Sequence, residues 1–362
     1  MTESQVRDAL RAVKYPGVSK DIVSTGLLKG VALDGNDALI NVALPTMAVT
    51  DEVKAAFVKE IEVAVEKVPG VARVKVQTEV KVASLPPPGD KNRAPGVKNV
   101  IAVASGKGGV GKSTVATNLA LALQRWGAKV GMLDADVFGP SLPQMLGTPE
   151  RAAGGTPDKR IAPALYWGMK VMSVAFFVEK ADAVVWRGPM VHKLLQQFME
   201  DVDWGELDYL IIDLPPGTGD VQLSLSQLVP LTGAVMVTTP QEVAIIDVVK
   251  GISMFKKVEV PILGVVENMS YYVCPGCGHH DEIFARGGGK RLAESVSAPF
   301  LGEIPIDPKI RFGGDSGTPI VVGVPDSENA RVFMDLAARV AGRVVSQVLS
   351  GPRRVASLVT IR

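Results

Sequence analysis

Hydrophobic and polar positions form two different patterns on either side of a proline-rich segment. Upstream of it, the pattern predicts two helices and three strands, over Gln5–Val13, Ile22–Leu33, Ala38–Ala43, Asp51–Lys67 and Val71–Val82. Helices and strands in this order, with so few elements, predict a small α+β domain over residues 1–83.

Downstream, short apolar runs rich in β-branched residues alternate with helical stretches. The predicted strands are Val100–Ala104, Lys129–Leu133, Leu210–Ile212, Ala234–Val237 and Ile262–Val266. Continuously apolar strands between helices indicate a parallel sheet that is buried on both faces. The expected fold class is therefore α/β: a parallel sheet with helices on both faces, preceded by the small α+β domain. Ligands of such sheets bind at the carboxyl ends of the strands.

The segment SLPPPGDKNRAPG, which begins at Ser84, has no apolar periodicity and reads as an exposed linker. We expect a linker over residues 84–97, the α/β domain over 98–350 and a short tail over 351–362. The tail sequence RRVASLVTIR raises the question of membrane-surface binding, but it forms no clear amphipathic helix, and a frayed end or a strand is favoured.

Composition and charge bear on the class of protein, its partners and its compartment, but not on its reaction. A chain of 362 residues with 47% apolar and 21% charged residues is ordinary for a globular protein. A formal net charge of +1 gives no reason to expect nucleic acid or an anionic membrane as a partner. We find no apolar run of about 18 residues and no signal-peptide layout in MTESQVRDAL, and we expect a cytoplasmic protein.

The strongest motif follows the first strand of the α/β pattern. GKGGVGKS, from Gly106 to Ser113, fits G-x-x-x-x-G-K-[ST] and leads into a helical pattern over Thr114–Gln124. Backbone N–H groups of such a loop point at phosphate oxygens, and the helix N-terminus adds partial positive charge. We expect ATP here, with Lys112 at the β- and γ-phosphates and Ser113 on Mg²⁺. The residues predicted to line the nucleotide are Gly106, Lys107, Gly108, Gly109, Val110, Gly111, Lys112, Ser113 and Thr114.

Two features of this loop leave alternatives open. Gly106, Gly108 and Gly111 also fit the dinucleotide fingerprint G-x-G-x-x-G, with Asp134 near the expected distance for a ribose ligand. The Lys-Ser pair after the last glycine favours the phosphate loop of an ATPase. Lys107 is a second lysine within the loop. It is either a solvated charge or a cation that contacts phosphate from a second subunit, as an arginine finger does.

Acidic residues follow two of the predicted strands. LDADVFGPS places Asp134 and Asp136 beside the expected phosphates, and LIIDLPPGTGD places Asp213 at the end of an apolar strand. This second pattern is that of a Walker B aspartate, which holds Mg²⁺ directly or through water. An isolated aspartate at a strand end is often only a turn former, so the assignment depends on the phosphate loop.

The chain has only two cysteines, Cys274 and Cys277, in the sequence CPGC. Zinc and [4Fe–4S] sites normally take four protein ligands, so two cysteines per chain point to a dimer that contributes two thiolates from each subunit. Three alternatives stay open: a zinc site completed by His279 and His280, a redox pair, and a structural pair without metal.

The loop with Lys107, the stretch DADVFGPS and the stretch DLPPGTGD together resemble the deviant-Walker ATPase family that includes MinD, ParA and the nitrogenase iron protein. ENMSYYVCPGCG and GEIPIDP are similar to signatures of its Mrp/ApbC group of iron–sulfur cluster carriers. The resemblance covers roughly residues 98–350. It implies a homodimeric ATP hydrolase that holds a labile [4Fe–4S] cluster at Cys274 and Cys277 and delivers it to apo iron–sulfur proteins.

The same resemblance implies a role for each matching residue. Lys107 acts across the dimer, Asp136 positions the attacking water and Asp213 serves Mg²⁺. Gly217 senses the γ-phosphate and Asn268 hydrogen-bonds adenine. The N-terminal domain resembles the small iron–sulfur-assembly domain often fused to these carriers, but the cysteine common there is absent from ALPTMAVTD. Competing functions are a positioning ATPase that acts on membrane or DNA, and a redox donor like the nitrogenase iron protein.

Overall fold

The computed structural model describes residues 1–84, 94–158, 160–177, 188–217, 219–229 and 231–350. Contacts divide these residues into two units, of which the first contains residues 1–84 and 341–350 and the second contains residues 94–340. Most of the predicted linker and all of the predicted tail lie outside the described residues. The exact domain boundaries therefore stay a prediction.

The first unit is a three-stranded sheet with two helices. Strands β1 (Leu28–Asp34) and β2 (Asp37–Leu44) are antiparallel, and β3 (Arg73–Val80) lies parallel to β2. Helices α1 (Glu3–Leu10) and α2 (Asp51–Glu66) contribute to one core with the sheet. Buried residues of α2 recur every four positions, which places them on one helix face: Phe57, Ile61 and Val65.

Two predicted boundaries in this unit are wrong. The helix predicted to reach Val13 ends at Leu10, and the strand predicted from Ile22 begins only at Leu28. The carboxylate of Asp21 accepts hydrogen bonds from the N–H of Val23 at 2.9 Å and of Ser24 at 2.8 Å. A side chain that takes these donors holds the backbone in a turn and removes them from any strand ladder.

The second unit contains a large sheet whose parallel centre confirms the predicted fold class. The five predicted strands become β4 (Val97–Ser105), β5 (Val130–Asp134), β10 (Leu207–Asp213), β11 (Gly233–Thr238) and β12 (Ile262–Val273). Their spatial order is β12-β11-β4-β10-β5, and each pairs with its neighbours in parallel.

Shorter strands extend both sides of this centre and make the sheet mixed. Strand β9 (Met169–Ser173) is parallel to β5, and β8 (Ala164–Tyr166) is antiparallel to β9. On the other side, β14 (Phe300–Ile306) is parallel to β12, and the two-residue β13 (His280–Asp281) is antiparallel to the end of β12. A separate ribbon pairs β6 (Gly154–Gly155) with β7 (Ile161–Ala162).

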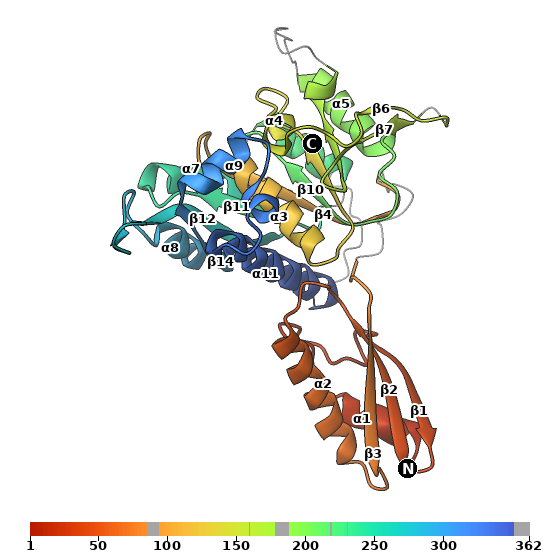
Figure 1. Ribbon diagram of the computed structural model, residues 1–362. Coiled ribbons are helices and arrows are strands. Elements are labelled where there is room, and N and C mark those ends of the chain that lie inside the picture. The colour runs from red at the N-terminus through yellow and green to blue at the C-terminus, as the bar shows by residue number, and fades with distance from the viewer. Residues whose placement is uncertain (85–93, 159, 178–187, 218, 230, 351–362) are drawn as a thin grey trace. The chain divides into compact units, whose positions relative to one another are not determined.

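Helices cover both faces of the large sheet (Figure 1). One face packs on α5 (Gly188–Glu200), α6 (Asp220–Leu228), α7 (Glu242–Lys257) and α8 (Gly288–Ser295) in a single apolar core. On the opposite face α3 (Lys112–Arg125) contacts the four central strands β4, β5, β10 and β11. Trp126, which follows α3, donates its indole N–H to the carbonyl of Met334 in α11 (Glu328–Ser350).

Short helices complete the unit: α4 (Leu142–Leu146), the 3₁₀ turn Val174–Phe176, α9 (Pro308–Asp315) and α10 (Ile320–Gly323). In the described part of the chain, none of the helices combines the length and the apolar character needed to cross a bilayer. The parallel strands all end at the same edge of the sheet, so the loops that follow β4, β5, β10 and β12 meet there.

Candidate nucleotide and cysteine sites

The loop between β4 and α3 has the glycine-dependent shape that the motif predicts. Gly109 and Gly111 both have φ of 80°, in the left-handed region that favours glycine. Gly106 is required for a different reason, since a Cβ there would lie 2.3 Å from the backbone carbonyl carbon of Asp247 in α7. The loop therefore threads closely past α7 and enters α3 at Lys112.

Lys112 and Asp213 meet directly at this edge. The Lys112 Nζ lies 2.6 Å from Asp213 Oδ1 and 4.0 Å from Asp136 Oδ2, and it also contacts Ser113 Oγ at 3.2 Å. Lys112 is only 6% exposed and Asp213 is fully buried. The fold thus brings together three sequence-predicted residues that are distant in the chain.

The free oxygen of Asp213 suits a cation. Its Oδ2 is buried and, within the described part of the chain, accepts no hydrogen bond. A buried carboxylate oxygen without a donor is costly unless a ligand satisfies it. Carboxylate and hydroxyl oxygens are the ligands that Mg²⁺ prefers, so Asp213 and the nearby Ser113 fit a Mg²⁺ site.

Asp134 supports the loop that carries Asp136 rather than the nucleotide. Its buried carboxylate accepts hydrogen bonds from the N–H groups of Asp136, Ser141 and Leu142 and from the hydroxyl of Ser173. Burial and, next, the negative charge of Asp213 raise the pKa of Asp134 to about 7. An acid occupied in this way is a poor ribose ligand, which disfavours the dinucleotide alternative.

Asp136 lies at the same edge, near Lys112, and the role in positioning water that the family resemblance implies for it stays a prediction. Its side chain is 14% exposed, and its Oδ1 accepts the N–H of Gly139 at 3.3 Å. Burial raises the pKa of Asp136 although the nearby charge of Lys112 opposes the change. The carboxylate borders a pocket of about 530 Å³ whose walls include Pro215, Pro216 and Gln222.

Gly217 and Asn268 both contact the phosphate-loop region, in ways that the sequence did not indicate. The N–H of Gly217 donates to the carbonyl of Ser105 at 3.0 Å. The Asn268 Nδ2 donates to the carbonyl of Val110 at 2.9 Å, and its side chain fills the space that a Cβ on Gly111 would need. Asn268 therefore supports the backbone of the phosphate loop. The roles predicted for these residues toward γ-phosphate and adenine stay predictions.

Lys107 is partly exposed at the start of the loop. Its carbonyl accepts the Ser105 hydroxyl at 3.0 Å, and within the described residues its ammonium group forms no ion pair. The loop therefore holds the backbone of Lys107 while the charge is not committed to a partner in the part of the chain described. Its role across a dimer stays a prediction.

The two cysteines lie on a tight turn at the tip of a hairpin. Strand β12 runs seven residues beyond its predicted end at Val266 and pairs with β13 through Val273 and His280. The turn closes through the N–H of Cys274 to the His279 carbonyl at 2.9 Å. N–H groups of Gly276 and Cys277, and then the Cys277 thiol, lower the pKa of the Cys274 thiol. Donors aimed at a sulfur stabilise the thiolate, which is the form that binds metals.

The hairpin offers two thiols, and among the described residues no third His, Cys, Asp or Glu side chain is placed to complete a metal site with them. Cys274 is partly exposed, Cys277 is exposed and both are free. The His280 ring stacks on Tyr271 with centroids 5.7 Å apart. In the ranges that the structure describes, no group of three or more His, Cys, Asp or Glu side chains is placed to hold a metal. The zinc site proposed with His279 and His280 is therefore not formed within one described chain.

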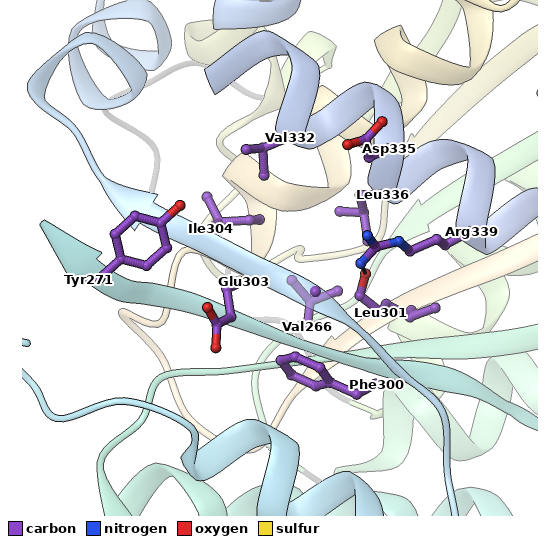
Figure 2. A pocket seen from close by; sticks show the side chains of 11 residues that line it. Val266, Tyr271, Phe300, Leu301, Glu303, Ile304, Val332, Asp335, Leu336 and Arg339 are labelled. Carbon is purple, nitrogen blue, oxygen red and sulfur yellow. Dashed lines mark hydrogen bonds between the residues drawn. The ribbon is translucent and has the colours of Figure 1, made fainter. Parts of the chain in front are cut away.

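A separate pocket of about 280 Å³ lies between β12, β14 and α11 (Figure 2). Tyr271, Glu303 and Arg339 are among its polar walls, and Arg339 donates to the Leu301 carbonyl at 2.8 Å. None of the residues predicted to bind nucleotide or metal lines it. It is distinct from both candidate sites.

Comparisons with known proteins cover both units. A family model described as NUBPL iron-transfer P-loop NTPase matches residues 96–341, and one described as iron-sulfur cluster assembly protein matches residues 3–77. An iron-sulfur cluster carrier protein of Deinococcus radiodurans is 46% identical over 342 residues, covering 94% of this chain and 95% of the relative. One of Haemophilus influenzae is 42% identical over 341 residues, covering 94% and 91%.

Among solved structures, a nucleotide-binding protein of Archaeoglobus fulgidus in complex with ADP is similar to the second unit. It is 41% identical, covers 63% of this chain and 89% of its own, and superposes with a TM-score of 0.56. The family match over residues 96–341 includes the phosphate loop, the three aspartates and both cysteines.

Proposed function

Because this chain belongs to the family of iron-transfer P-loop NTPases and matches iron–sulfur cluster carrier proteins over most of its length, we propose that it hydrolyses ATP and carries a labile iron–sulfur cluster. The cluster is held between two copies of the chain and passed to apo iron–sulfur proteins. Free thiols on an exposed turn suit a reducing compartment, and we place the protein in the cytoplasm.

The phosphate end of ATP is held by the loop and by Lys112. The loop's N–H groups bind the phosphates, and Lys112 leaves Asp213 to reach the β- and γ-phosphates. Ser113 and Asp213 hold Mg²⁺, which neutralises phosphate charge when bound. Support comes from the 2.6 Å contact of Lys112 with Asp213 and from the free oxygen of Asp213.

Hydrolysis is an in-line attack of water on the γ-phosphorus. Asp136 orients this water and accepts its proton as the new P–O bond forms and the bond to the β–γ bridging oxygen breaks. Lys107 from the second copy stabilises the charge that develops on the transferred phosphoryl group. The uncommitted charge of Lys107 supports this assignment.

One observation carries the cluster proposal: two thiols on an exposed turn, with backbone N–H groups directed at one sulfur and no third ligand in the described chain. Two copies supply four thiolates, the number that a [4Fe–4S] cluster requires. A positioning ATPase has no use for such a pair. The mixed arrangement of buried nucleotide site and exposed thiols suits a carrier that must release its cargo.

The proposal is tested by anaerobic reconstitution with iron and sulfide. The wild type is expected to bind about two iron and two sulfide per chain, as one [4Fe–4S] cluster shared by two chains. Cys277→Ala should lose them while its calorimetric affinity for Mg·ATP is retained. A wild type without bound iron, or a Cys277→Ala variant that loads as the wild type does, would refute the cluster assignment.

A further inference from the structure

Glu267 is a fully buried carboxylate that no part of the proposed chemistry uses. It lies on β12, one residue before Asn268 and seven before Cys274. Glutamate is almost never fully buried unless its charge is compensated. The partners of Glu267 therefore show what it does.

The cysteines lie in the segment between Glu267 on β12 and the start of α8, and the Glu267 carboxylate bonds one end of this segment to the other. Oε1 accepts the Ser270 hydroxyl at 2.6 Å and the N–H of Gly287 at 2.9 Å, and Oε2 accepts the N–H of Gly289. Gly287 and Gly289 stand at the N-terminus of α8, where partial positive charge favours a carboxylate. Glu267 thus lies on β12, before the cysteines, and bonds to the N-terminus of α8, which follows them.

The residues that approach Glu267 are glycines, because a side chain would prevent so close an approach. Gly287 has φ of 80°, and a Cβ on Gly289 would lie 2.9 Å from the Cβ of Glu267. A Cβ on Gly288 would lie 2.4 Å from the Pro240 carbonyl oxygen. The contact between the carboxylate and the glycine run is therefore tight and specific, and it closes the base of the hairpin.

A second set of contacts braces the hairpin above its base. The Arg286 guanidinium lies 4.8 Å above the centre of the Tyr271 ring and pairs with Glu303 of β14 at 2.6 Å. Tyr271 also stacks on His280. Figure 2 shows Tyr271 and Glu303 on the neighbouring strands β12 and β14. The hairpin is thus braced as one body on β12.

The same short stretch of β12 contacts the phosphate loop. Asn268, next to Glu267, donates to the Val110 carbonyl at 2.9 Å. Met269 follows with φ of 57°, and the pairing of β12 with β14 shifts register between Asn268 and Tyr272. A non-glycine residue in this conformation persists only where surrounding contacts hold it. Two adjacent residues therefore connect the loop to the base of the hairpin.

We propose that Glu267 is a positioning residue that couples the phosphate loop to the thiols. A change in the loop on nucleotide binding moves Asn268, and the tie through Glu267 makes the hairpin move with β12. Without the tie, the glycine run absorbs the movement. The inference rests on the proposed function, because it assigns the regulation of the proposed thiol site, but its test uses the thiols alone.

The test measures the rate at which a maleimide modifies each cysteine in the cluster-free protein, with and without Mg·ATP. In the wild type the nucleotide is expected to change the rate by about fivefold, at the lower end of measured couplings between sites. Glu267→Gln replaces one acceptor oxygen with a donor that faces an N–H. Its nucleotide effect on the rate should fall below about twofold while its Mg·ATP affinity stays within about twofold of wild type.

Two further variants keep the test decisive. Glu242→Gln is the matched control, because Glu242 is an exposed carboxylate that pairs with Arg291 of the same helix α8 at 3.4 Å, and it should behave as wild type. Ser270→Ala removes only one of the bonds to Glu267 and should reduce the effect partly. This milder variant carries the test if Glu267→Gln melts at a much lower temperature.

The proposal is overturned if the wild type shows no nucleotide effect on thiol rates, or if Glu267→Gln binds nucleotide and keeps the full effect. Iron loading is measured separately on the same preparations. A wild type that holds no iron would refute the carrier function without changing the thiol rates, so the two failures are distinguishable.

Discussion

The phosphate loop and the cysteine hairpin lie at the same edge of one sheet but differ in how complete they are. At the loop, Lys112 is 6% exposed and already paired with a fully buried Asp213. At the hairpin, Cys277 is exposed and the described chain offers no third ligand. The contact between Lys112 and Asp213 is thus formed within one chain, whereas in our proposal the thiol site is completed by a second copy.

The cause of this difference is topological. Parallel strands place Asp134 beside Asp213 in register, so the carboxylates converge without any further structure. The cysteines lie in the turn after β12, which continues past its pairing with β11 and returns through the two-residue β13. On this extension Cys274 is partly exposed and Cys277 is exposed.

The largest expected effect comes from Lys112→Ala, which should weaken nucleotide binding without affecting the thiol site. Loss of a cation that contacts phosphates in a buried site should cost about 3 kcal/mol or more, or more than about 100-fold in Mg·ATP affinity by calorimetry. Iron loading should persist. Lys250→Ala, on the exposed face of α7, is the control. Equal affinity in the two variants would refute the proposed role of Lys112.

Cys274→Ser should impair the thiol site without affecting nucleotide binding. Serine keeps the size of the side chain but removes the thiolate, so iron content after reconstitution should fall by about tenfold or more, because clusters of this kind are held by cysteine thiolates. Calorimetric ATP affinity should not change, since the nucleotide site does not include the hairpin. Retention of most of the iron would mean that the cluster has other ligands.

Asp134→Asn tests whether burying the Asp134 carboxylate at the nucleotide edge destabilises the fold. Asp134 has a folded-state pKa of about 7 against an ordinary value of 3.8. Its contribution to stability is therefore fully present below about pH 4 and is lost as the pH rises to about 7, by about 1.4 kcal/mol per pH unit. The difference in free energy of unfolding between wild type and variant, from urea denaturation, should fall over this range. A difference independent of pH would contradict the assignment.

The smallest effect is expected from His280→Ala. If two thiolates per chain are the ligands, loss of a ring that stacks on Tyr271 should change the iron content little. The measurement is iron per chain after the same reconstitution, with Cys274→Ser beside it as the reference for full loss. A loss as large as that of the cysteine variant would restore the histidine-containing site.

Local motifs predicted the shape of the phosphate loop better than the contacts between distant segments. GKGGVGKS specified the loop, because Gly106, Gly109 and Gly111 each meet a backbone requirement there. Strand ends placed Asp136 and Asp213, since parallel strands share an edge. Turn chemistry was missed at Asp21, where a side chain competes with the ladder and delays β1 to Leu28.

The parts that could not be predicted depend on tertiary contacts. Strand β12 was expected to end at Val266 but runs to Val273, because pairing with β14 and β13 sustains it past a shift of register. The glycine run at Gly287–Gly289 stands 20 residues from Glu267, and nothing in the local pattern joins them. An acid inside an apolar strand was the one signal of that contact.

Native mass spectrometry of the anaerobically reconstituted protein tests the central claim most directly, because it reports how many chains hold one cluster. We predict a species of two chains with four iron and four sulfide, as four thiolates on one [4Fe–4S] cluster require, and cluster-free protein when the chains separate. A cluster retained by a single chain would contradict the account.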